Sequence, residues 1–198
     1  MSSAYEHSDE RAFQIPQSYH AMRARGLFDP EGKNELFLTD FQWLSLLTIA
    51  SSTLVGGAIP FARTTRREHF CWAPEHDHGR GVPVTFHPRG ESPALYSPDF
   101  TAFIFRALLE EFSLSWLVNG FGLENTAARF RRYADAVTPF LPDDWARTVR
   151  EVSRRPLVRL GSGVYGVLSR EESDYLIQEA LATPGLNQPL EELAGIEA

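Results

Sequence analysis

The chain has 198 residues, a formal net charge of −7 and 43% hydrophobic residues. This composition is that of a folded globular protein, and the acidic balance disfavours a nucleic-acid-binding surface. The single cysteine, Cys71, cannot form an internal disulfide, and the sequence has no apolar run of about 18 residues that could span a bilayer. Residues 1–10 lack the basic start and apolar run of a signal peptide, so we expect a cytoplasmic protein without membrane attachment.

The first part of the chain predicts short elements. Residues 1–14 form a polar lead, and Pro16 favours a helix over 17–25 that Gly26 ends. The sequence then predicts a short strand over 35–38. Apolar residues at helical spacing predict a buried helix over 41–51.

Between residues 56 and 96 the pattern changes to short apolar runs separated by Gly, Pro and charged residues. The connections are too short for crossover helices, so the runs predict antiparallel strands. The four predicted strands cover 58–63, 69–73, 82–87 and 94–96.

Amphipathic helices dominate the rest of the chain. The clearest has Ser97 as a candidate cap, Pro98 at its first position and an apolar stripe from Phe100 to Phe112. A second helix runs from about 127 to 137. A third follows Asp143 or Asp144 as its cap and includes residues 145–152, and a fourth begins at a capping box formed by Ser169 and Glu172. Residues 157–160 and 164–168 predict a small hairpin.

Short consecutive strands followed by helices indicate an α+β fold. We expect a mostly antiparallel sheet of about four to six strands packed by helices, with a mainly helical C-terminal extension. The extension, residues 139–198, is expected to pack on the same domain, because about 60 residues with one hairpin and two helices form a marginal core of their own.

Gly161, Gly163 and Gly166 satisfy the G-x-G-x-x-G pattern of dinucleotide-binding sites. In such sites a helix opens inside the glycine motif, whereas here Val167 and Leu168 intervene before the cap at Ser169. The pattern therefore favours a hairpin turn, and we predict no cofactor.

Histidine and cysteine side chains gather between residues 69 and 87, on predicted strands and on the loop over 74–81 that joins two of them. They are weak candidates for a metal site or, through Cys71, for a Cys–His nucleophile pair. A solvated loop and a core thiol explain them more simply. The candidate metal ligands are His69, Cys71, His76, His78 and His87. Signatures of serine hydrolases, zinc proteases and Walker loops are missing, so no catalytic residue is predicted and we expect no enzyme.

The order of motifs over residues 15–115 resembles the SUKH superfamily, which includes yeast cell-wall assembly regulators and many bacterial immunity proteins. The resemblance is carried by Ile15-Pro16-Gln17-Ser18-Tyr19, Ile59-Pro60-Phe61-Ala62, Phe70-Cys71-Trp72, Pro83-Val84-Thr85-Phe86, Glu91, Tyr96 and the helix with Phe100, Phe103 and Ile104. It implies a SUKH-like α+β domain over 15–138 that binds a protein partner and carries no catalytic residues.

The first functional hypothesis is therefore a bacterial immunity protein that neutralises a cognate toxin by occluding it. Glu171, Glu172 and Asp174 are the candidate partner contacts, although a solvated helix start explains them more simply. The alternatives are a metal-dependent enzyme that uses residues 69–87, and a regulatory scaffold protein.

The net negative charge of the chain is concentrated at one end of the sequence. Residues 171–198 contain seven acidic residues and no lysine or arginine, whereas residues 129–159 contain eight arginines against four acids. The acidic segment thus either pairs with these arginines within the fold or faces a partner.

Overall fold

The computed structural model describes residues 13–28, 41–54, 57–77, 79, 81–114 and 121–193. The predicted strand over 35–38 lies outside these residues. The elements, in chain order, are α1 (Gln17–Ala24), β1 (Phe41–Trp43), α2 (Leu46–Ser51), β2 (Ile59–Thr64), β3 (His69–Trp72), the 3-10 turn η2 (Pro74–His76), β4 (Val84–His87), β5 (Ala94–Ser97), α3 (Phe100–Ser113), α5 (Leu123–Val137), the 3-10 turn η3 (Thr138–Phe140), α6 (Asp143–Ser153), β6 (Val158–Arg159), β7 (Tyr165–Gly166), α7 (Arg170–Leu181) and α8 (Leu190–Leu193).

The main sheet has five antiparallel strands in the order β1-β2-β3-β4-β5, so each strand pairs with its neighbour in sequence. A second, two-stranded sheet is the predicted hairpin of β6 and β7. The α+β class is confirmed, and so are the four predicted strands of the main sheet.

The first strand corrects the predicted helix over 41–51. Residues 41–43 are β1, and only residues 46–51 are helical, beginning after Ser45, whose hydroxyl accepts a hydrogen bond from the Thr48 amide. Trp43 is buried in β1, where it is the register partner of Ala62 and stacks on Phe28 at 4.0 Å. Pairing with a strand 20 residues away overrides the local helical spacing.

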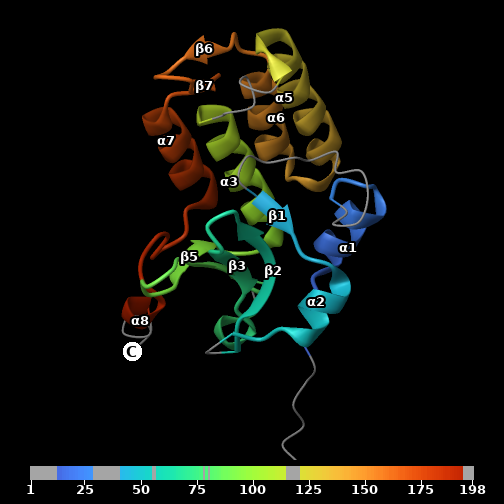
Figure 1. Ribbon diagram of the computed structural model, residues 1–198, viewed down its shortest axis with the longest axis vertical. Helices are drawn as coiled ribbons and strands as arrows, with labels where there is room; N and C mark the ends of the chain where they lie inside the picture. The colour runs from blue at the N-terminus through green and yellow to red at the C-terminus, as the bar shows by residue number, and fades with distance from the viewer. Residues whose placement is uncertain are drawn as a thin grey trace, which may run out of the picture.

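Helix α3 is the centre of the molecule and is buried on almost every side, beyond the predicted stripe. Phe103 packs against Phe61 and Phe70 of the sheet at ring distances of 5.0 and 5.3 Å. On other sides, Phe112 meets Phe130 of α5 and Phe105 stacks on Trp145 of α6. Figure 1 shows α3 running from the sheet into the group of helices α5, α6 and α7.

Two predicted helix caps are wrong. Asp99, not Ser97, caps α3, because its carboxylate accepts the Ala102 amide at 2.8 Å while Ser97 ends β5. Helix α6 begins after Pro142 without a side-chain cap, so Asp143 and Asp144 occupy its first turn. The predicted cap of α7 is confirmed, since the Ser169 hydroxyl accepts the Glu172 amide at 3.1 Å.

The C-terminal part belongs to the same core as the sheet: one cluster of buried side chains includes Trp72, Phe103, Val149 and Ile177. The chain then returns to the outer edge of β5, where the Leu95 amide donates to the Gln188 carbonyl and the Asn187 amide to the Leu95 carbonyl. This segment covers a sheet edge that would otherwise be open for pairing with another chain.

Candidate functional site

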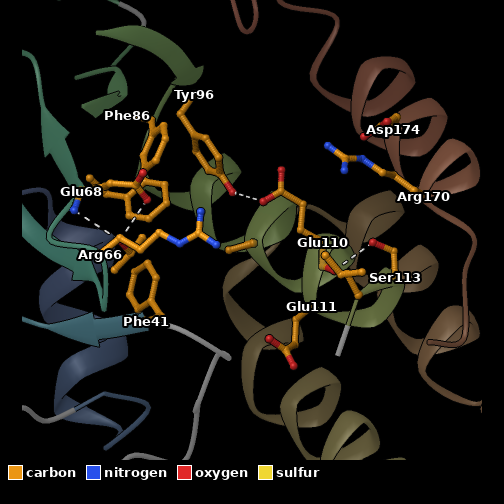
Figure 2. A pocket seen from close by; sticks show the side chains of 14 residues that line it. Phe41, Arg66, Glu68, Phe86, Tyr96, Glu110, Glu111, Ser113, Arg170 and Asp174 are labelled. Carbon is orange, nitrogen blue, oxygen red and sulfur yellow. Dashed lines mark hydrogen bonds between the residues drawn. The ribbon is translucent and has the colours of Figure 1, made fainter. Parts of the chain in front are cut away.

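A pocket of about 590 Å³ lies where the sheet meets α3 and α7. Figure 2 shows its lining side chains, which come from segments far apart in the sequence. They are Phe41, Thr64, Arg66, Glu68, Phe70, Phe86, Tyr96, Ala107, Glu110, Glu111, Ser113, Leu114, Arg170 and Asp174.

Aromatic rings form one wall of this pocket. Phe70 lies centrally, with ring distances of 5.3 Å to Phe41, 4.9 Å to Phe86 and 5.0 Å to Tyr96. The four residues come from β1, β3, β4 and β5, and the side-chain alternation of paired strands places them on one face. The sheet thus offers the pocket a continuous surface of rings.

A hydrogen-bonded network of three residues lies beside the rings. The Tyr96 hydroxyl donates to Glu110 Oε2 at 2.5 Å, and Arg106 Nε donates to Glu110 Oε1 at 2.8 Å. The Arg106 guanidinium also lies 3.8 Å from the centre of the Tyr96 ring and donates to the Tyr96 carbonyl at 2.7 Å. The Glu110 carboxylate is therefore held by both neighbours at once.

The environment fixes the charges of this network. Burial first, and then the negative charge of Glu110, raises the pKa of Tyr96 well above its usual value, so its phenol stays protonated and donates. Burial acts to lower the pKa of Arg106, but the nearby Tyr96 and Glu110 outweigh it and the pKa is raised. The network therefore combines an arginine cation with a neutral phenol that donates its proton to the Glu110 side chain in a hydrogen bond.

Carboxylates outnumber guanidinium groups in the lining of the pocket, and one of them, Glu110, is paired with Arg106. The described lining residues include four carboxylates and two guanidinium groups. Arg66 lies in the turn between β2 and β3 and Arg170 at the start of α7, and both extend toward the pocket in Figure 2. Both arginines are exposed, and neither forms an ion pair with another described residue.

The three predicted partner contacts have different surroundings. Glu172 pairs with Arg155 at 2.5 Å, so one acid of the C-terminal segment meets one arginine of the basic segment within the fold. Glu171 is exposed on the first turn of α7, and Asp174 lies at the edge of the pocket. Only Asp174 of the three lines the pocket.

The histidine and cysteine candidates are only partly brought together. His69 and His87 are register partners on β3 and β4, and the Thr85 hydroxyl lies 2.9 Å from His87 Nε2. Burial lowers the pKa of both histidines, with Arg63 acting further on His69 and His69 on His87. His76 lies apart from the strands in η2, and His78 lies outside the described residues.

Cys71 is fully buried in β3, and burial raises the pKa of its thiol to about 12. The thiolate, which is the nucleophilic form, is therefore scarce at neutral pH. Within the described part of the chain, no group of three or more His, Cys, Asp or Glu side chains is arranged to hold a metal ion.

The glycine motif lies in the β6–β7 hairpin, and the following helix begins only after Ser169, as predicted. The structure adds a reason for Gly166. A Cβ there would lie 2.7 Å from the Phe112 carbonyl oxygen and 2.9 Å from that of Ser113, so the glycine permits β7 to lie against the end of α3.

Comparison with protein-family models, with curated proteins and with solved structures finds no match to this chain. Among the described residues, no helix combines the length and apolar character that a membrane span requires. The pocket itself was not predicted from the sequence. The spacing of Arg106 and Glu110 fits an ion pair within a helix, but nothing local shows that it meets Tyr96.

Proposed function

We propose that this protein is a non-catalytic protein-binding module, a bacterial immunity protein that neutralises a cognate toxin in the cytoplasm by occluding it. The observation that carries the proposal is the acid-rich, ring-walled pocket beside α7. Aromatic rings and positioned charges are the groups that dominate the energetics of protein interfaces. The SUKH resemblance supports the same proposal, because it implies binding and an α+β domain of this kind.

Electrostatics supports a basic partner. Glu171 and Asp174 lie exposed on the first turns of α7, next to a pocket with more carboxylates than guanidinium groups. Opposite potentials on two proteins accelerate their encounter, and the acceleration weakens as salt screens it. A basic toxin that acts on nucleic acid is the kind of partner that fits this surface.

A metal-dependent enzyme is the alternative, and the pairing of His69 with His87 is the observation that favours it. Metal analysis of protein purified without an affinity tag tests it. Stoichiometric zinc or another transition metal, together with a lower melting temperature in chelator, supports the enzyme; substoichiometric metal and an unchanged melting temperature remove it.

Co-purification from the source organism tests the binding proposal. We expect one partner to be retained at low salt, to halt growth when it is expressed alone in a bacterial host, and to be harmless when this chain is expressed with it. A partner that is harmless alone would contradict the immunity role and favour the regulatory scaffold, and the absence of any retained protein would contradict binding.

A further inference from the structure

The Glu110 carboxylate is held in place by its neighbours and can still accept further hydrogen bonds. Its side chain is 41% exposed, whereas its partner Arg106 is 10% exposed and Tyr96 is buried. Each carboxylate oxygen accepts one hydrogen bond from these partners, and a carboxylate offers about four acceptor sites. Two buried neighbours thus hold an acceptor in a fixed orientation at the pocket.

The surroundings of Glu110 fit a flat cation. Tyr96 shows in this structure that a ring of the wall accepts a guanidinium group, since Arg106 lies 3.8 Å from its centre. Phe41 and Phe86 are half-buried rings of the same wall. Aromatic faces attract guanidinium groups, and carboxylates bind them through parallel hydrogen bonds.

A second carboxylate lies at the edge of the pocket. Asp174 of α7 is exposed at the pocket edge and acts electrostatically on Arg106, which places its charge near the network. Glu110 of α3 and Asp174 of α7 therefore both belong to the lining of the pocket, which Figure 2 shows.

We propose that this pocket receives an arginine side chain of the protein partner, with its guanidinium bound by Glu110 and Asp174 and its stem lying on the rings of Phe41 and Phe86. The inference rests on the proposed function, because it names what the partner inserts. The exposed arginines Arg66 and Arg170 then have a role as well. Their positive charges repel a cation in the pocket, and they attract acidic groups that surround the inserted arginine on the partner.

The probe is N-acetyl-arginine-N-methylamide, added to the full chain and followed by NMR shifts of the backbone amides. Its matched control is the citrulline analogue, which has nearly the same shape and no charge. We expect the arginine compound to shift the amides of Tyr96, Glu110 and Asp174 in a saturable way and the citrulline compound to bind about tenfold more weakly. Equal binding of the two compounds, or shifts only elsewhere, would overturn the proposal.

Charge-changing variants test whether the pocket binds a cation or an anion. Asp174→Asn should weaken binding of the arginine compound by about tenfold, whereas Arg66→Ser should strengthen it by about twofold. Glu124→Gln, on an exposed first turn of α5 away from the pocket, is the control and should change nothing. Weaker binding in Arg66→Ser would show an anion site instead and overturn the proposal. All three positions are exposed, so the fold should survive each change.

The two proposals fail separately. If the co-purified toxin binds Asp174→Asn and wild-type protein equally, the arginine pocket is wrong and the immunity function stands. If the arginine compound binds as expected and no toxin is found, the pocket stands and the immunity function is wrong.

Discussion

The half-exposed Glu110 depends on buried neighbours for its orientation, and the same dependence on neighbours governs the ionisation of other side chains. His87 lies in β4 beside His69 and close to the Thr85 hydroxyl. Burial, and then the charge of His69, lowers the pKa of His87 below its usual value of about 6.5. Protonation of His87 is therefore less favourable in the folded than in the unfolded chain.

This difference predicts a loss of stability in acid. Below a pH of about 6.5 the unfolded chain binds a proton at His87 more readily than the folded chain does, so the free energy of unfolding falls as pH decreases. His87→Gln removes this contribution and keeps a polar group near Thr85. Urea denaturation at pH 7 and pH 5 should show a smaller fall in the variant than in wild type. His20→Gln, at an exposed position of α1, is the control, and an equal fall in all three proteins would contradict the prediction.

At the scale of the element, the sequence is most informative where a pattern is local. Strands β2 to β5 follow short apolar runs bounded by turn residues. Ser169 caps α7 by accepting a hydrogen bond from the amide of Glu172, three residues further along the chain. Strand β1 was predicted as helix because Trp43 and Leu44 also fit helical spacing, and its pairing with β2 is not visible locally. The burial of α3 beyond its predicted apolar stripe could not be predicted for a similar reason: Phe105 of α3 contacts Trp145 of α6 only in the folded chain.

The β6–β7 hairpin gives a test of the glycine motif at this scale. Gly166→Ala places a Cβ against the backbone oxygens at the end of α3, which should destabilise the protein by about 1–3 kcal/mol. Gly161→Ala is the matched control, because a Cβ there meets nothing within 4 Å and the change should cost little. Thermal unfolding of both variants measures the difference, and equal stabilities would show that the close approach of β7 to α3 is unimportant.

At the scale of the whole molecule, the pocket depends on contacts that no single segment specifies. Phe41, Tyr96, Glu110 and Asp174 belong to four elements, and the order of their residues in sequence does not show that they share one cavity. The sequence does identify the acidic character of the last segment. The structure places part of that charge: Glu172 pairs with Arg155 within the fold, whereas Glu171 and Asp174 are exposed at the start of α7.

The three acids at the start of α7 should control the rate of encounter with the partner. Replacing Glu171, Glu172 and Asp174 by serine should slow association with the co-purified toxin and flatten its dependence on salt, because fewer charges attract the basic surface. Stopped-flow association at low and high salt measures both effects. Glu124→Gln serves as the single-charge control away from α7, and unchanged association of the triple variant would exclude these acids as steering groups.

Titration of the toxin's own activity with this protein tests the central claim most directly. A module that occludes its target binds it one to one, so activity should fall linearly and reach its minimum at one equivalent. Full loss of activity with a small fraction of an equivalent would mean that the protein acts as a catalyst on the toxin, and undiminished activity at excess would mean that it does not neutralise it; either result would contradict the account.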